Sequence, residues 1–190
     1  MQQQFIEYSH AGTVLEGFLA SPAKAGERRP AVLVSHAWAG RDDFVIDKAK
    51  ALAGLGYAAF ALDNYGKGVL GANNEENSKL IGPFMADRAL LRERLLAGLE
   101  TLRAQPGVDP DRIAIMGYCF GGLCALDLAR SGADIRGAIS FHGLLLPNGL
   151  DPRPLKARVR ARHGYAAPMV PPEQVRDRGA PVNEYRVDLS

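Results

Sequence analysis

Hydrophobic positions along the chain alternate between short apolar runs and longer segments with helical spacing. The runs AVLVSH (31–36) and YAAFALD (57–63) are almost wholly apolar, which is typical of parallel strands buried on both faces. Between them, Phe44–Leu55 repeats apolar residues at helical intervals and is followed by Gly56, a common residue just past a helix end. This part of the chain is therefore predicted to be a βαβ unit.

The same alternation extends to both sides of this unit. The predicted strands are Gln4–Tyr8, Val14–Leu19, Arg112–Gly117 and Arg136–His142, and the predicted helices are Met85–Leu102 and Gly121–Arg130. Strands that alternate with helices predict an α/β fold, a doubly wound and mostly parallel sheet with helices on both faces. Ligands in such folds bind at the carboxyl ends of the strands.

The last forty residues differ in composition from the rest of the chain. They hold six of the twelve prolines, two leucines and no isoleucine or phenylalanine. Arg158, Arg160 and Arg162 recur at period two and would charge one face of a strand that should be buried on both sides, at a cost of several kcal/mol for each unpaired arginine. We therefore expect an α/β core over residues 1–154, and a Pro/Arg-rich segment over 155–190 that is poorly ordered or forms an edge strand plus loop.

Overall composition excludes several classes of protein. The 190 residues suit one α/β domain, and 23 basic against 21 acidic residues are too balanced for a nucleic-acid-binding protein. No apolar run reaches the ~18 to 20 residues that cross a bilayer, and the first residues lack the pattern of a signal peptide. We expect a cytoplasmic protein without membrane or nucleic-acid partners. Cys119 and Cys124, if on one helix, lie roughly 8 to 9 Å apart and are predicted to be thiols.

The segment GYCFGG (117–122) carries the clearest chemical signal. It stands where a predicted strand turns directly into a helix, the context of a nucleophile elbow. Small residues at Gly117 and Gly121 let strand and helix approach closely, so that Cys119 is held in a strained turn with its thiol exposed to the cleft. The N-terminus of the helix would stabilise negative charge on the sulfur or on a reacting oxygen. The alternative is a structural cysteine in a glycine-rich junction such as a nucleotide-binding loop, but no Asp or Glu ends the next strand to hold a ribose.

With these residues the chain resembles the dienelactone hydrolases, a cysteine-using branch of the α/β-hydrolase fold. The resemblance runs from about Tyr8 to Val175 and includes VLVSHAWAG, LAGLGYAAFALDNYGKG, GYCFGG, SFHG and HGYAAPMVPPEQV. It implies that Cys119 attacks the carbonyl of an ester or lactone. It also implies an oxyanion hole made by the backbone N–H groups of Phe120 and, in the loop after the 31–36 strand, Trp38.

The sequence departs from the family pattern at three positions. Ala167 stands in HGYAAPMVP where the family has the acid of its triad, and Ala37 stands in HAWAG where the family has a Glu beside the nucleophile. The family histidine follows a further strand, whereas the last histidine here is His163 and the sequence ends at Ser190. We therefore expect a hydrolase fold that is incomplete at its C-terminus.

Other polar residues have weaker claims to a functional role. His142 and His36 end the strands on either side of the elbow and are possible substitute bases, although a structural role is the favoured interpretation of each. Tyr118 is expected to line the pocket, and Arg88 could bind a substrate carboxylate. The expected surface or helix-capping residues are Asp42, Asp43, Asp63 and Asp87, and Cys124 is expected to belong to the core.

Two functions of different class remain open. The first is a dienelactone-hydrolase-like esterase or lactonase that uses Cys119, with weak turnover because the triad acid and histidine are not present. The second is a non-catalytic scaffold that binds a small molecule, or that forms a homodimer through the face left open by the missing terminal strand. We expect neither a metal site nor an organic cofactor.

Overall fold

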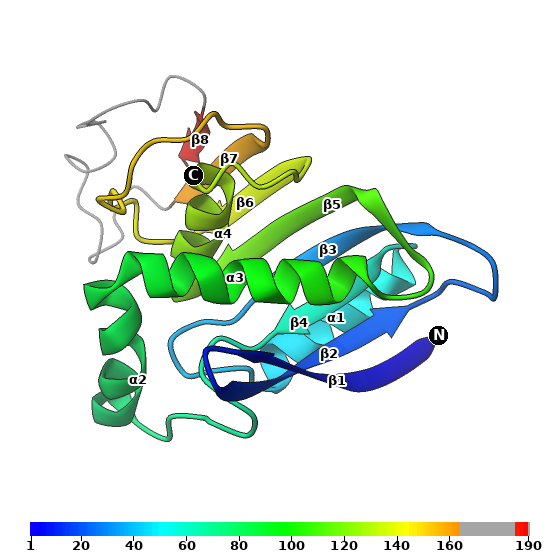
Figure 1. Cartoon of the computed structure of the whole chain (residues 1–190), viewed down its shortest axis with the longest axis horizontal. Coiled ribbons are helices and arrows are strands. Elements are labelled where there is room, and N and C mark those ends of the chain that lie inside the picture. Colours follow the sequence, from blue (N-terminus) through cyan, green and yellow to red (C-terminus); the bar gives the residue numbers. More distant parts are fainter. Residues whose placement is uncertain (164–184, 190) are drawn as a thin grey trace.

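A computed structural model describes residues 1–163 and 185–189. The described residues form one eight-stranded sheet with the strand order β1-β2-β4-β3-β5-β6-β7-β8 (Figure 1). Its strands are β1 (Gln2–His10), β2 (Thr13–Ser21), β3 (Arg29–Ser35), β4 (Ala58–Leu62), β5 (Val108–Tyr118), β6 (Gly137–Phe141), β7 (Arg158–His163) and β8 (Tyr185–Leu189). β1 and β2 form an antiparallel hairpin, β2 pairs with β4 antiparallel, and every other neighbouring pair is parallel.

Helices cover both faces of this sheet, as the sequence predicts. The helices are α1 (Asp43–Gly54), α2 (Asn74–Ala86), α3 (Arg88–Arg103) and α4 (Phe120–Arg130). α1 packs on β2, β3 and β4, whereas α3 and α4 lie on the opposite face and contact each other (Figure 1). The doubly wound, mostly parallel α/β fold is confirmed.

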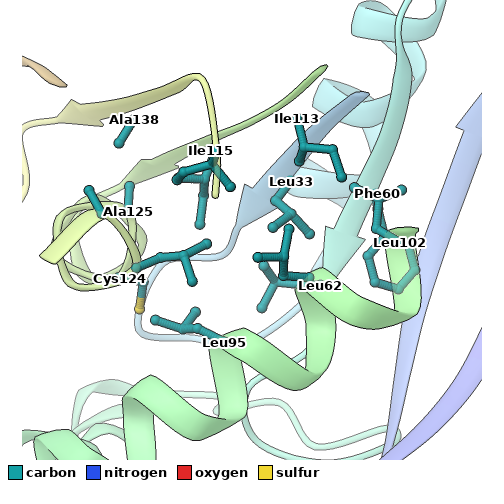
Figure 2. Packing of buried hydrophobic residues seen from close by; sticks show 14 of the residues in the cluster. Leu33, Phe60, Leu62, Leu95, Leu102, Ile113, Ile115, Cys124, Ala125 and Ala138 are labelled. Atoms are coloured by element: carbon teal, nitrogen blue, oxygen red, sulfur yellow. The ribbon is translucent and has the colours of Figure 1, made fainter. Parts of the chain in front are cut away.

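Two apolar clusters, one on each face, hold the layers together. The larger one joins α3 and α4 to the sheet: Leu95 and Leu102 of α3 face Leu33 and Leu62 (Figure 2). The smaller cluster places Val45, Ala49 and Ala53 of α1 against the other face of the sheet. Full burial of each leucine contributes about 1.5 to 3 kcal/mol, so that packing on the sheet is the main source of helix stability.

The single helix predicted over Met85–Leu102 is wrong at its start. The backbone of Asp87 is extended, and its carboxylate accepts a hydrogen bond from the N–H of Leu90 at 2.9 Å, so that α3 begins at Arg88. Met85 belongs to α2, which the sequence reading missed. Its signal was the capping pattern N-x-x-E, in which Asn73 and Glu76 each accept a backbone N–H at the start of the helix.

The arginine-rich segment forms a strand with two neighbours. β7 pairs with β6 and β8, so that it is neither unformed nor an edge strand, in contrast to the expectation for this stretch. Val159 and Ala161 are buried, while Arg158 and Arg162 are exposed and Arg160 is half-buried. The expectation failed because it assumed burial on both faces, whereas the alternating residues of β7 bury only one.

The order of the strands places one site at the carboxyl edge of the sheet. The chain passes from β3 outward to β4, then returns across β3 to β5 and continues in the opposite direction. The loops after β3 and β5 therefore diverge at a topological switch point, where α/β sheets bind ligands.

Candidate active site

Cys119 occupies a strained turn between β5 and α4. Its backbone angles are φ 54° and ψ −117°, in the left-handed half of conformational space that non-glycine residues rarely adopt. Phe120 is already the first residue of α4, so that the strand turns into the helix without a loop. The local geometry is the strand–turn–helix elbow that the segment GYCFGG predicts.

Three glycines make this sharp turn sterically possible. A Cβ on Gly117 would lie 2.1 Å from the carbonyl oxygen of Gly121, and one on Gly121 would lie 2.2 Å from the carbonyl oxygen of Ser35. A Cβ on Gly122 would lie 2.6 Å from Ser140 Oγ. The start of α4 is therefore seated directly on the carboxyl ends of β3 and β6.

The two cysteines differ in their surroundings. Cys119 is half-buried, and no described side chain forms a hydrogen bond with its thiol. Its backbone N–H donates to the carbonyl of Phe141 at 3.0 Å, which fixes the elbow to the end of β6. Cys124 is fully buried in the core beneath α4, and burial raises the pKa of its thiol far above the usual range (Figure 2). Cys119 is thus the thiol with access to a ligand, and Cys124 is a core residue, as expected.

The two predicted oxyanion-hole residues lie on the two segments that meet at the switch point. Phe120 heads α4, and its N–H has no i−4 carbonyl within the helix to bind. Trp38 lies in the loop after β3 and is half-buried. The carbonyl oxygens at the end of β3 come within 2.2 to 2.7 Å of the Cβ position of Gly121, so that this loop runs directly beside the elbow.

His36 is fully buried and engaged at both ring nitrogens. Its Nε2 accepts a hydrogen bond from the N–H of Asn64 at 3.2 Å, and Nδ1 lies 2.6 Å from the carbonyl oxygen of Ala37. Because an N–H donor faces Nε2, the proton resides on Nδ1. Burial lowers the pKa of His36 and keeps the ring neutral. This arrangement ties two loops together and leaves no ring nitrogen for a reacting group.

His142 lies close to the elbow through its backbone. It follows Phe141, the acceptor for the N–H of Cys119, and its own N–H donates to the carbonyl of Arg162 at 2.8 Å. The residue is exposed, has a φ of 41°, and its ring lies 6.1 Å from the ring of Tyr118. His142 is thus an exposed imidazole at this edge of the sheet, next in sequence to the residue that accepts the N–H of Cys119.

Tyr118 and Arg88 have contrasting environments. The Tyr118 ring stacks on Phe141 at 5.0 Å and meets the edge of Phe44 at 5.1 Å, and partial burial raises its pKa. Tyr118 thus belongs to an aromatic wall next to Cys119. Arg88 is buried, and its Nε and Nη2 donate to Asp127 Oδ2 at 2.8 and 2.5 Å. Its guanidinium joins α3 to α4 and faces a carboxylate of the protein itself.

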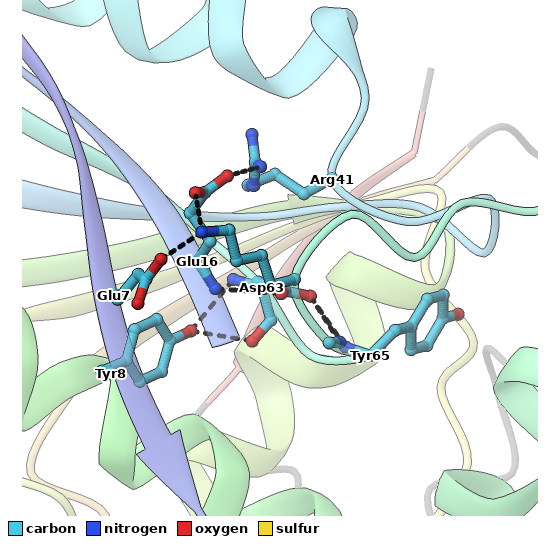
Figure 3. Close-up of polar contacts among 8 residues, drawn as sticks. Glu7, Tyr8, Glu16, Arg41, Asp63 and Tyr65 are labelled. Carbon is cyan, nitrogen blue, oxygen red and sulfur yellow. Dashed lines mark hydrogen bonds and ion pairs between the residues drawn. The ribbon is translucent and has the colours of Figure 1, made fainter. Parts of the chain in front are cut away.

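Asp63 was misjudged as a surface or capping residue. It is buried at the end of β4, where its carboxylate accepts hydrogen bonds from the N–H groups of Glu16, Tyr65 and Gly66 at 2.9 to 3.1 Å (Figure 3). The segment D-x-Y-G directly after a buried strand is the signal for such a turn, because Asp side chains bind backbone N–H groups two residues on. Asp42 and Asp87 do cap helices, as expected.

Sequence reasoning also overlooked Tyr65. Its hydroxyl donates to the carbonyl of Trp38 at 2.9 Å, and its ring stacks near Phe120 with 6.0 Å between centroids. Both thiols lie close enough to raise its pKa further above the value that burial sets. The position of Ala167, in contrast, lies outside the described residues, as do all residues from 164 to 184.

The mostly parallel sheet with a strained strand–helix elbow at its switch point defines the α/β-hydrolase fold. The family model of the dienelactone hydrolase family matches residues 15–190, and the chain belongs to this family. None of the helices described for this chain is long and apolar enough to cross a membrane.

Individual relatives agree with this assignment. A probable 2-oxo-3-(5-oxofuran-2-ylidene)propanoate lactonase of Bradyrhizobium sp is 34% identical over 129 residues, which cover 67% of this chain and 51% of that protein. The chain spans about half the length of such curated relatives. Among solved structures, m3DLH has a TM-score of 0.88 and 35% identity, and a dienelactone hydrolase-like promiscuous phosphotriesterase from metagenomic libraries has 0.83 and 29%; each match covers 100% of this chain and 81% of the other.

Proposed function

We propose that this chain hydrolyses a small carboxylic ester or lactone through a covalent intermediate on Cys119. The observation that carries the proposal is the left-handed backbone of Cys119 at the junction of β5 and α4. Such strain persists only where the surrounding structure enforces it, and it clusters at functional sites. Membership of the dienelactone hydrolase family and the similarity to the probable lactonase of Bradyrhizobium support the same reaction class.

The proposed reaction has two covalent steps. The Cys119 thiolate attacks the carbonyl carbon, a C–S bond forms, and the π electrons move to the oxygen, which the N–H groups of Phe120 and Trp38 stabilise. Collapse of this oxyanion breaks the C–O bond and leaves a thioester. The oxygen of the broken bond takes up the proton that the thiol gave up; it leaves as an alcohol or phenol from an ester and stays attached to the acyl group of an opened lactone. Water then attacks the thioester, and the acid and the free thiol are released.

His142 is the proposed substitute base. It is an exposed imidazole at the carboxyl edge of the sheet, and it lies one residue past the acceptor for the Cys119 N–H. The wall of Tyr118, Phe141 and Phe44 beside it offers flat apolar surface for the acyl or leaving group. Because no described side chain is hydrogen-bonded to the thiol, His142 is proposed to act on the water of the second step, and its loss is expected to slow deacylation.

The test is p-nitrophenyl acetate hydrolysis with intact-mass analysis of the protein. We expect a burst of one equivalent of p-nitrophenol and an acetyl adduct, both absent in Cys119→Ala and both present in Cys124→Ala. His142→Gln should slow the decay of the adduct by about 10-fold or more, whereas His10→Gln should leave it unchanged.

The opposite outcome would favour the second function. Equal rates for the wild-type protein and Cys119→Ala, with no adduct, would leave a non-catalytic scaffold whose cleft binds a small molecule. The observation that favours a non-catalytic scaffold is that no described side chain hydrogen-bonds to the Cys119 thiol.

A further inference from the structure

We infer that Tyr65 is a positioning residue that holds both halves of the oxyanion hole in place. The inference rests on the proposed function, because it concerns the N–H groups of Trp38 and Phe120. Tyr65 lies in the loop after β4, on neither of the segments that carry these two donors, yet it contacts both. No motif of the elbow itself would have identified it.

The hydroxyl of Tyr65 holds the loop that carries Trp38. It donates to the Trp38 carbonyl at 2.9 Å, while Nδ1 of His36 donates to the preceding carbonyl, that of Ala37, at 2.6 Å. The Ala37 carbonyl shares its planar trans peptide with the N–H of Trp38, so that this N–H points away from His36. The carbonyls on both sides of the donor are thereby fixed, one by His36 and one by Tyr65.

The ring of Tyr65 contacts the other half of the site. It is stacked near Phe120 at 6.0 Å with 20° between the planes, and near Phe84 of α2 at 5.7 Å with 27°. Its edge contact with His36 has a centroid distance of 4.7 Å. Aromatic pairs at these separations contribute about 0.5 to 1.5 kcal/mol beyond area burial, so that Tyr65 connects the start of α4 to the Trp38 loop.

The backbone of Tyr65 is itself held in place by hydrogen bonds. Its backbone N–H donates to Asp63 Oδ1 at 2.9 Å, and Figure 3 shows its ring directed away from this buried carboxylate. A further bond from the N–H of Gly71 to the carbonyl of Ala39, at 3.0 Å, joins the same two loops. Burial raises the pKa of the phenol, and the hydroxyl therefore stays protonated and remains a donor at every working pH.

The variant that tests this role is Tyr65→Phe, which keeps the ring and removes the hydroxyl. Its matched control is Tyr8→Phe. The Tyr8 hydroxyl is also bonded to backbone, since it donates to the carbonyl of Asp63 at 2.7 Å and accepts from the N–H of Asp63 at 3.0 Å, but it contacts neither Trp38 nor Phe120. Both variants lose a hydroxyl bonded to backbone, at a comparable cost of about 1 to 3 kcal/mol in stability.

The first readout needs no activity. Trp38 is the single tryptophan of the chain, so that acrylamide quenching of its fluorescence reports on this loop alone. We expect the quenching constant to rise by about 1.5-fold or more in Tyr65→Phe, because a loop that loses an anchoring bond opens locally, and to stay unchanged in Tyr8→Phe.

The second readout compares two reactions of the same thiol. Acetylation of Cys119 by p-nitrophenyl acetate passes through an oxyanion, whereas alkylation by iodoacetamide does not. Tyr65→Phe should slow acetylation by about 10-fold, less than the 10²- to 10³-fold loss from deleting a donor outright, and should change alkylation by less than 2-fold.

These readouts separate the two claims. Unchanged quenching in Tyr65→Phe, or an equal fall in acetylation and alkylation, would overturn the role of Tyr65. A wild-type protein that is never acetylated at Cys119 would overturn the proposed function instead, and the quenching comparison would still decide whether Tyr65 positions Trp38.

Discussion

Single residues at this site take their roles from neighbours far away in the sequence. His36 looks like a base when only its place at a strand end is known. In the fold, the N–H of Asn64 and the carbonyl of Ala37 occupy both its ring nitrogens. A buried polar side chain must be satisfied, and here backbone groups of two loops satisfy it. The residue that resembled a catalytic group therefore acts as a connector.

This role predicts a pH dependence of stability. Burial lowers the pKa of His36 below the unfolded value of 6.5, so that the unfolded chain binds more protons below that pH. Stability from this group is complete above about pH 7 and is lost as the pH falls through 6.5. Between pH 7 and 5.5 we expect a loss of about 1 kcal/mol in the free energy of unfolding, measured by urea titration.

The control for this prediction is the pH dependence of the free energy of unfolding in two variants. His36→Gln should be less stable at pH 7, because its side chain cannot make both bonds, and should lose less stability on acidification than the wild-type protein. His10→Gln should keep the wild-type slope. A wild-type slope in His36→Gln would show that other groups carry the pH dependence.

At the scale of elements, α4 is the best-fixed helix of the site. Its first residues rest on β3 and β6 through Gly121 and Gly122, and its middle is tied to α3 by the pair of Asp127 with Arg88. Removing one partner of such a buried pair costs about 3 to 5 kcal/mol. The elbow thus keeps its geometry because the helix behind it cannot shift.

Gly121→Ala tests this seating. The added methyl would meet the carbonyl oxygens of Ser35 and His36 at 2.2 and 2.7 Å, and neither backbone can yield without moving β3. We expect the free energy of unfolding to fall by about 1 to 3 kcal/mol, as for an overpacked core, and acetylation of Cys119 to be lost.

A matched substitution is available on the surface. Gly54, in the last turn of α1, has no atom within 4 Å of its Cβ position, so that Gly54→Ala should leave acetylation unchanged and add up to about 1 kcal/mol of stability. Equal stability of the two alanine variants would contradict the seating of α4 on β3.

At the scale of the whole molecule, the central strands of the sheet are buried and the strands near its edges are partly exposed to solvent. β3 pairs on both sides and is covered by helices on both faces, whereas β1 is an edge strand with mostly exposed side chains. The arginines of β7 lie next to the other edge of the sheet, where one face of the strand is exposed and its charged side chains stay hydrated. The homodimer through the C-terminal side of the sheet and the cytoplasmic location stay predictions.

Hydrogen exchange should reproduce this gradient. Amides of β3 and β4 should exchange only by global unfolding, whereas the amides of β1 that face no partner strand should exchange at least about 100-fold faster. Fragments covering 29–35, 58–62 and 2–10 can be compared by mass spectrometry. Equal protection of β1 and β3 would mean that the edge of β1 is covered by another chain.

The sequence by itself determined the α/β class of the fold and the position of the elbow. Short, continuous apolar runs between turn residues are typical of strands buried on both faces, and the pattern GYCFGG at a strand–helix junction predicts the elbow that Cys119 occupies. These features are local, because periodicity and glycine spacing act within a few residues. The strand β7 was harder to predict, because the cost of its arginine side chains depends on whether another layer of the fold covers that face of the sheet.

Only the tertiary structure decided which polar residues belong to the site. Arg88 donates to Asp127, 39 positions away, and Asp63 accepts from the N–H of Glu16. Tyr65 contacts Trp38 through its hydroxyl and Phe120 through its ring. The physical reason is that hydrogen-bond partners of buried groups are chosen by proximity in space, and proximity across a sheet leaves no local mark in the sequence.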